Sequence, residues 1–89
     1  MICHLITRAE WEWVGDVYRP ESLESEGFIH FSSPDQLAAT AERHYPGVPD
    51  LLVLHVDETR FGDELRWEDG FPHLYAPLPR TAVVEVRPL

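Results

Sequence analysis

The stretch Leu51-Leu52-Val53-Leu54-His55-Val56-Asp57 is apolar at every position except His55 and Asp57. A strand with one face in solvent alternates between apolar and polar residues, whereas a nearly continuous apolar run of this length is typical of a strand covered on both faces. Residues 51–54 are also the longest apolar run in the chain. We therefore predict that residues 51–57 form the central strand of the fold.

Two main helices are predicted before this strand. A Thr-x-x-Glu capping box from Thr7 to Glu10 opens the first helix, which should end at Gly15. The second opens at Ser33-Pro34-Asp35-Gln36, with Ser33 as the N-cap and a proline at the first helical position. This second helix should end at Pro46-Gly47 and bury a face made of Leu37, Ala38, Ala41 and Tyr45.

Short strands account for most of the remaining chain. Residues 17–19 should be extended, residues 21–26 should form a single helical turn, and residues 77–79 should form a turn between the last two strands. About six strands and two helices without a regular strand–helix alternation predict an α+β fold with a small, mostly antiparallel sheet. The strands are expected at residues 1–6, 28–32, 51–57, 65–68, 71–75 and 82–87.

Composition limits both the size of the fold and the chemistry available to it. The chain has 89 residues, of which 44% are apolar and 26% charged, so residues 1–89 are expected to form a single domain. Sixteen acidic residues against seven basic ones give a net charge of -9, which disfavours a nucleic-acid partner. All seven basic residues are arginines, so phosphate-loop, Schiff-base and general-base lysines are excluded.

The lone Cys3 and the absence of long apolar segments point to a cellular location. A single cysteine cannot form an internal disulfide, and no stretch has the character of a signal peptide or a membrane span. We expect a cytoplasmic protein without a membrane partner, either monomeric or weakly homodimeric.

Strand alternation separates Cys3 from His4. Successive side chains of a strand point to opposite faces, so these two residues cannot form a nucleophilic pair, and Cys3 is interpreted as a small buried apolar residue. The same alternation places Phe28, His30 and Ser32 on one face. His30 then either binds a ribose hydroxyl or is a core histidine bonded to a carbonyl.

Residues 71–75, Phe-Pro-His-Leu-Tyr, are the densest aromatic segment and follow Trp67-Glu68 after a short turn. Phe71, His73 and Tyr75 share a face if the segment is extended, which would make either a stacking wall for a ligand or a plain aromatic core. Glu68 is either the acidic member of such a pocket or a solvated carboxylate.

The remaining histidines and the serines give weaker signals. His44 at a helix end suits the helix dipole, and His55 in the central strand suits a core histidine. His4, His30 and His73 lack any metal-binding spacing, so no metal is expected, although a site formed by the fold stays open. Ser32 and Ser33 lack a nucleophile-elbow motif.

The whole chain resembles the bacterial family known as domain of unknown function 952. The resemblance rests on two motifs above all, Glu26-Gly27-Phe28-Ile29-His30-Phe31-Ser32 and Phe71-Pro72-His73-Leu74-Tyr75. Shorter matches at Ile2-Cys3-His4-Leu5, Ser22-Leu23, Pro49-Asp50-Leu51-Leu52 and Arg66-Trp67-Glu68 extend it over nearly all of the sequence.

Residues 28–57 are more distantly similar to the catalytic half of the transfer-RNA 2′-phosphotransferases, which have the ADP-ribosyltransferase-like fold. That resemblance implies a split sheet around the nicotinamide end of NAD, with His4 on a ribose and His73 near the place of the usual catalytic glutamate. His30 would match a histidine of the phosphotransferases. No Glu-x-Glu motif and no match to the winged-helix half are found here, so protein ADP-ribosylation and transfer-RNA processing are not expected.

The leading hypothesis is therefore a small domain that binds NAD or a related nucleotide and carries out ADP-ribosyl or glycosyl transfer. His30 and His73, with Glu68, would be catalytic, because imidazole titrates near neutrality. Arg8, Arg19 and Arg66 are the arginines nearest in sequence for phosphate. The ligand would be held by His4, Ser32, Arg66, Trp67, Phe71 and Tyr75. Two alternatives are a noncatalytic module for a small ligand or peptide and a metal-dependent hydrolase with a three-histidine site.

Overall fold

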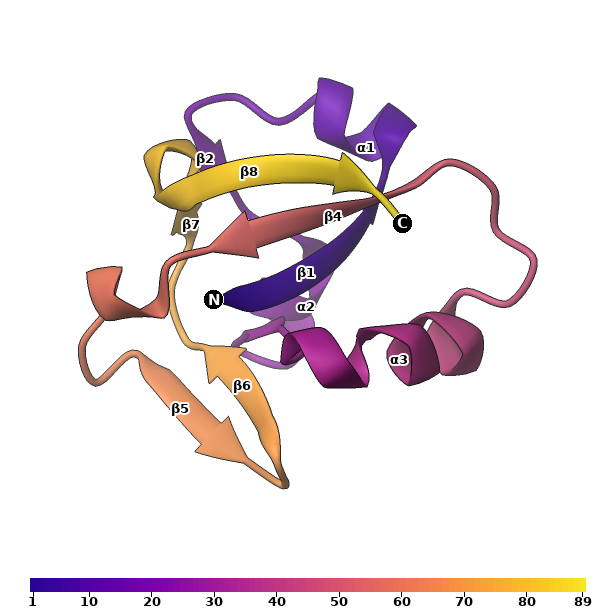
Figure 1. Ribbon diagram of the computed structural model, residues 1–89. Coiled ribbons are helices and arrows are strands. Elements are labelled where there is room, and N and C mark those ends of the chain that lie inside the picture. The colour runs from indigo at the N-terminus through magenta and orange to yellow at the C-terminus, as the bar shows by residue number, and fades with distance from the viewer.

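The predicted central strand is β4 (Leu51–Val56), the middle member of a three-stranded antiparallel sheet in the order β1–β4–β8 (Figure 1). Its neighbours are β1 (Ile2–Thr7) and β8 (Val83–Pro88). The computed structural model describes residues 1–89. Residues 51–57 are thus confirmed as the central strand, ending one residue earlier than predicted.

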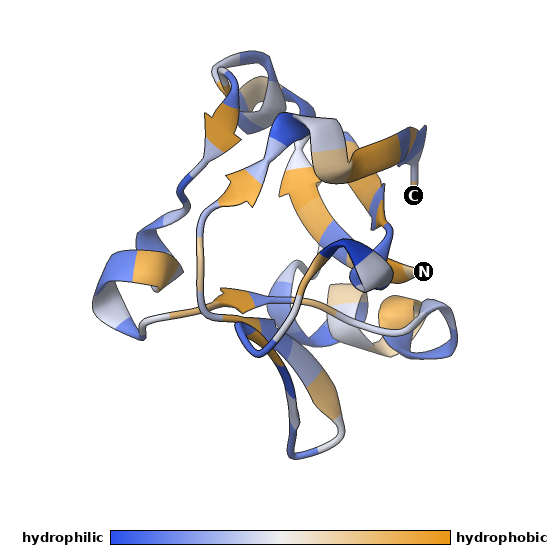
Figure 2. Ribbon diagram, turned by 90° about the vertical axis from the view of Figure 1, so that its left-hand side faces the viewer, coloured by the Kyte–Doolittle hydropathy of each residue, from blue (hydrophilic) through white to orange (hydrophobic).

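Both faces of this sheet carry apolar clusters, which explains why β4 has almost no polar positions. Leu52 and Leu54 point into the larger cluster, and Leu51 and Val53 point into the smaller one, against α3. Alternation of side chains along the strand divides them in this way. Figure 2 shows the apolar colour concentrated on these strands, while the helices and loops are mostly hydrophilic.

Two smaller sheets complete the structure, so the sequence undercounts the strands. Strands β3, β6 and β5 form an antiparallel sheet in that order, and β2 pairs with β7. The prediction that residues 77–79 are only a turn is wrong, because Leu78–Pro79 pairs with Val17–Tyr18. The α+β class and the mostly antiparallel pairing are confirmed, with eight strands where about six were expected. The two strands not predicted are β2 (Val17–Tyr18) and β7 (Leu78–Pro79). The remaining strands of the smaller sheets are β3 (Ile29–His30), β5 (Leu65–Glu68) and β6 (Phe71–Leu74).

Strand β3 is shorter than the five residues predicted. Only Ile29 and His30 pair with β6, and the chain then bends so that Ser32 forms a bridge to Cys3 of β1. The Ser32 and Cys3 backbones exchange two hydrogen bonds of 2.8 Å. This bridge ties the β3–β6–β5 sheet to the edge of the central sheet.

Three α-helices are present: α1 (Arg8–Glu12), α2 (Glu21–Ser25) and α3 (Leu37–His44). Thr7 caps α1 by accepting from the Glu10 N–H at 3.1 Å, but the helix ends before the predicted Gly15. A 3₁₀ turn opens α3, and Ala38 is exposed rather than buried. The buried stripe of α3 is Leu37, Ala41 and Tyr45, four residues apart, which turns Ala38 away.

The 3₁₀ turn that opens α3 is Pro34–Gln36, and two further 3₁₀ segments lie at Glu58–Arg60 and Arg80–Ala82. None of the helices combines the length and the apolar character that crossing a bilayer requires.

Candidate functional site

An open cleft of about 860 Å³ lies beside β1, with side chains of α2 on one wall and of α3 on the other. Its volume falls within the range of pockets that hold small molecules. His4, His30 and His73 all line it, together with Ser32 and Phe71. The fold therefore brings five of the predicted site residues to one cavity, although they come from three separate segments of the chain.

His4 lies in the floor of the cleft and is 9% exposed. Its Nδ1 is 2.6 Å from the carbonyl oxygen of His30, and its Nε2 is 2.9 Å from the Tyr18 hydroxyl. A carbonyl can only accept, so Nδ1 carries the proton and Nε2 accepts from Tyr18. Burial lowers the pKa of His4 from 6.5 to about 4, which keeps the ring neutral.

These contacts correct the expected role of His4. Both ring nitrogens are bonded within the protein, so the ring has no free nitrogen for a ribose hydroxyl. His4 instead holds the backbone of His30 in place. It is a positioning residue.

His30 and His73 are direct cross-strand partners in the β3–β6 ladder, and their ring centroids are 5.7 Å apart. Phe28 stacks on His73 at a centroid distance of 4.1 Å and an interplanar angle of 16°, and it also contacts His30 at 4.6 Å. Paired positions on neighbouring strands place side chains close together on one face. The two imidazoles are therefore held side by side at the edge of the cleft.

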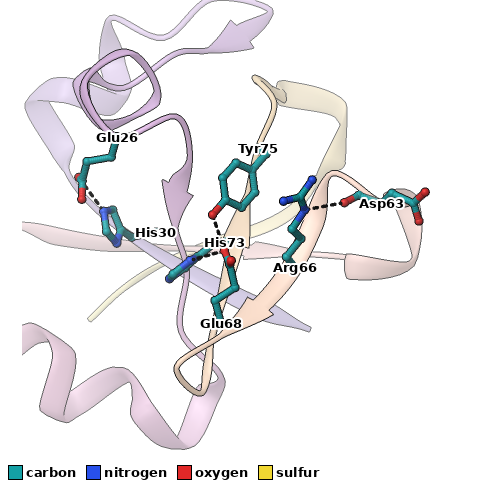
Figure 3. Close-up of polar contacts among 7 residues, drawn as sticks. All are labelled: Glu26, His30, Asp63, Arg66, Glu68, His73 and Tyr75. Atoms are coloured by element: carbon teal, nitrogen blue, oxygen red, sulfur yellow. Dashed lines mark hydrogen bonds and ion pairs between the residues drawn. The ribbon is translucent and has the colours of Figure 1, made fainter.

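Each of these two histidines has its own carboxylate partner (Figure 3). His30 Nε2 is 2.9 Å from Glu26, and His73 Nδ1 is 3.1 Å from Glu68. The Tyr75 hydroxyl donates to the same Glu68 oxygen. A carboxylate that accepts from one ring nitrogen fixes the tautomer and leaves the other nitrogen, Nδ1 of His30 and Nε2 of His73, with a lone pair.

Glu68 is held in its charged form by these bonds. The Tyr75 hydrogen bond, followed by that of His73, lowers the pKa of Glu68. The same Tyr75–Glu68 bond raises the pKa of the Tyr75 hydroxyl, so this group remains a donor. Glu68 and Tyr75 do not line the cleft. They lie behind His73 and act through it.

Ser32 is 3% exposed, and its hydroxyl is 3.0 Å from the Thr40 hydroxyl of α3. Thr40 donates to the Gln36 carbonyl at 3.1 Å, so Ser32 donates to Thr40 and keeps its acceptor positions. Ser32 thus remains at the floor of the cleft with unused lone pairs. Phe71 lines the wall next to His73.

Three predicted ligand-binding residues lie away from the cleft: Tyr75, which bonds Glu68 behind His73, and also Trp67 and Arg66. Trp67 pairs with Pro72, whereas its neighbour Arg66 pairs with His73, so the Trp67 side chain points to the opposite face of the hairpin. Its expected stacking on a ligand in this cleft is therefore wrong. Arg66 lies 4.7 Å above the Tyr75 ring and donates to the Asp63 carbonyl at 3.4 Å, so it does not reach the cleft either.

Sequence reasoning missed three residues of this region: Tyr18, Glu26 and Arg43. Tyr18 is in a two-residue strand that carries no periodic signal, and its role depends on a contact across 14 positions. Glu26 lies four residues before His30, a spacing that the family motif contains but that was not interpreted as a pair. Arg43 lines the cleft in place of Arg8, Arg19 and Arg66.

The three-histidine metal site is not formed. No group of three His, Cys, Asp or Glu side chains is arranged to hold a metal ion, and both nitrogens of His4 are already bonded. The fold therefore gives no support to the metal-dependent hydrolase.

An α+β fold with a histidine-lined cleft defines the class of this protein, and comparison with known proteins identifies its family. The model of a family described as protein of unknown function, DUF952, matches residues 5–86. The chain belongs to this family, as the Glu-Gly-Phe-Ile-His and Phe-Pro-His-Leu-Tyr motifs predict. No curated protein matches the chain.

Protein CC0527 from Caulobacter crescentus has a similar structure at 32% sequence identity. Its crystal structure gives a TM-score of 0.90 over 99% of this chain and 84% of that one. Its solution NMR structure gives a TM-score of 0.84 over 99% and 83% of the two chains. The resemblance to the ADP-ribosyltransferase-like fold is not tested by these comparisons and stays a prediction.

Proposed function

We propose that this domain binds a nucleotide of the NAD class in the cleft and transfers its ribosyl group to a hydroxyl acceptor. The observation that carries the proposal is the pair His30 and His73 at the edge of the cleft, each oriented by a carboxylate. Each of these adjacent imidazoles has a nitrogen with a free lone pair, which can accept a proton from a reacting group. The choice of NAD comes from the distant resemblance of residues 28–57 to the transfer-RNA 2′-phosphotransferases.

The free edge of β1 supports a carboxamide-bearing ligand. Cys3 directs both its N–H and its carbonyl to Ser32, so Leu5, two residues further on, directs its backbone groups to the same side. The Leu5 side chain is buried on a sheet face, yet Leu5 lines the cleft, which places its backbone there. A carboxamide such as that of nicotinamide offers the complementary donor and acceptor.

In the proposed reaction the bond between ribose C1′ and the nicotinamide ring nitrogen breaks, and its electron pair neutralises the pyridinium. The acceptor oxygen forms the new bond to C1′ and releases its proton to Nε2 of His73. Glu68 stabilises the imidazolium that results, because it accepts from Nδ1. Glu68 is thus a positioning residue for His73, and His30 lies beside His73 with its Nδ1 lone pair free for a second proton transfer.

The experiment is a calorimetric titration of the protein with NAD⁺, ADP-ribose and nicotinamide, followed by chromatographic detection of released nicotinamide. Heat of binding together with nicotinamide release supports the proposal. No heat with any of the three ligands at millimolar concentration would remove the nucleotide-binding function altogether.

Substitution of His73 separates chemistry from binding. His73→Gln should lose most of the turnover, by roughly 100-fold or more, while NAD⁺ affinity changes little, since general-base catalysis contributes on this scale. His55→Gln is the matched control, because His55 does not line the cleft. Circular dichroism of both variants shows whether they fold. Equal turnover in the folded His73 variant and the control would overturn the catalytic assignment.

A second candidate is a noncatalytic binding module that uses the same cleft. The observation that favours it is the acidic lining of the cleft. Three carboxylates line the cavity, those of Glu10, Glu21 and Asp35, whereas only one arginine does. Such a lining suits a ligand with a cationic part. Binding without any nicotinamide release would decide for this candidate.

A further inference from the structure

Arg43 is the one basic side chain with a permanent charge that lines the cleft. The chain has no lysine, and the other six arginines lie elsewhere. Arg43 is exposed and makes no ion pair or side-chain hydrogen bond, so its guanidinium is free for a ligand. A free guanidinium in a cavity is a charged donor that can bind two phosphate oxygens at once.

Arg43 lies near the end of α3 that is farther from the strand carrying His73. Gln36, just before α3, donates from its side chain to the carbonyl of Gly70 at 2.8 Å, so this end of the helix is linked to the turn of the β5–β6 hairpin. Arg43 is seven residues further along, about 10 Å at 1.5 Å per residue. Between Gln36 and Arg43, the α3 residues that line the cleft are Ala39 and Thr40.

The rest of the lining is negatively charged. Glu10 and Glu21 lie on the walls formed by the α1 and α2 segments, and Asp35 lies at the start of the 3₁₀ turn before α3. The Ser33 hydroxyl donates to Asp35 at 2.6 Å and lowers its pKa, so this carboxylate is charged at neutral pH. Three carboxylates repel a ligand whose negative charge exceeds what one arginine neutralises.

We infer that Arg43 binds the diphosphate of the ligand and that the acidic lining restricts the site to NAD⁺ in preference to ADP-ribose and NADP⁺. NAD⁺ combines its diphosphate with a cationic ring, whereas ADP-ribose lacks that ring and NADP⁺ carries a further phosphate. The cleft would then select NAD⁺ in two ways: Arg43 attracts the diphosphate, and the carboxylates repel ligands with more negative charge. The inference rests on the proposed nucleotide-binding function and adds a specificity-determining residue to it.

The test is a calorimetric titration of NAD⁺, NADP⁺ and ADP-ribose into the wild-type protein and three variants. Arg43→Gln should weaken NAD⁺ binding by roughly 10- to 100-fold, the effect of one charged hydrogen-bonding group. Arg19→Gln is the matched control, since Arg19 is also without an ion pair but lies outside the cleft, and it should bind normally. Glu21→Gln should narrow the preference for NAD⁺ over NADP⁺.

The outcomes separate this inference from the proposed function. If the wild-type protein binds NAD⁺ but Arg43→Gln binds it equally well, the inference is wrong and the nucleotide function stands. Equal wild-type affinity for NAD⁺, NADP⁺ and ADP-ribose would overturn the charge selection. If the wild-type protein binds none of the three, the proposed function itself is wrong, and the inference falls with it.

Discussion

His4 couples the stability of the domain to pH. In the folded protein its pKa is lowered to about 4 by burial, against 6.5 for an ordinary histidine. Between these values the unfolded chain binds a proton that the folded protein does not, so stability increases with pH in this window. The full difference corresponds to about 3 kcal/mol of unfolding free energy, present above pH 6.5 and lost by pH 4.

Urea denaturation at several pH values measures this effect. We expect the free energy of unfolding to fall by about 2 kcal/mol from pH 7 to pH 5, where the unfolded chain binds the proton and folded His4 does not. His4→Gln should remove this part of the pH dependence, whereas His44→Gln, at the exposed end of α3, should retain it. An NMR titration of the wild-type His4 ring gives an independent reading. Stability that is flat between pH 7 and pH 5, or a ring that titrates near 6.5, would refute the reasoning.

Four further substitutions, one of them a surface control, test individual contacts through chemical or thermal denaturation. Tyr18→Phe removes the donor to His4 and should cost about 1–3 kcal/mol, because a buried acceptor is left unpaired; an unchanged midpoint would argue against the bond. Leu54→Ala, at a fully buried position of β4, should cost about 2–5 kcal/mol, while Val84→Ala, which is 50% exposed, should stay within about 0.5 kcal/mol. Similar losses for the two would contradict the placement of the core. Gly70→Ala should lower the free energy of unfolding by about 1 kcal/mol, because its φ of +83° disfavours any residue with a Cβ. No steric clash adds to this cost, since an added Cβ meets nothing within 4 Å. An unchanged stability would contradict the left-handed conformation of this turn.

Local patterns allowed the central strand and the β5–β6 hairpin to be predicted. An apolar run covered on both faces identified β4, and the short turn after Trp67-Glu68 separated the two strands that pair as β5 and β6. Asp69 and Gly70 in this turn have positive φ values of 53° and 83°. The pairing of strands β2 and β7 could not be predicted from the sequence. Each has two residues, and their pairing joins Val17–Tyr18 to Leu78–Pro79 across some 60 positions of the chain, a long-range contact without a local signal.

The candidate site was predictable only in part, for a related reason. Strand alternation and aromatic neighbours identified His30 and His73, because both properties belong to adjacent positions in the sequence. The role of His4 was missed, since it depends on the hydroxyl of Tyr18 and the carbonyl of His30, which only the folded chain brings together. Trp67 was misplaced because sequence proximity to Glu68 says nothing about which face of the hairpin it occupies.

The most direct test of the proposed nucleotide-binding cleft is an NMR titration of the ¹⁵N-labelled protein with NAD⁺. We expect the backbone amide signals of Leu5, Ser32 and Thr40 to shift together, while the indole signals of Trp13 and Trp67, which lie outside the cleft, remain unchanged. No shift at millimolar NAD⁺, or shifts confined to the two indoles, would contradict it.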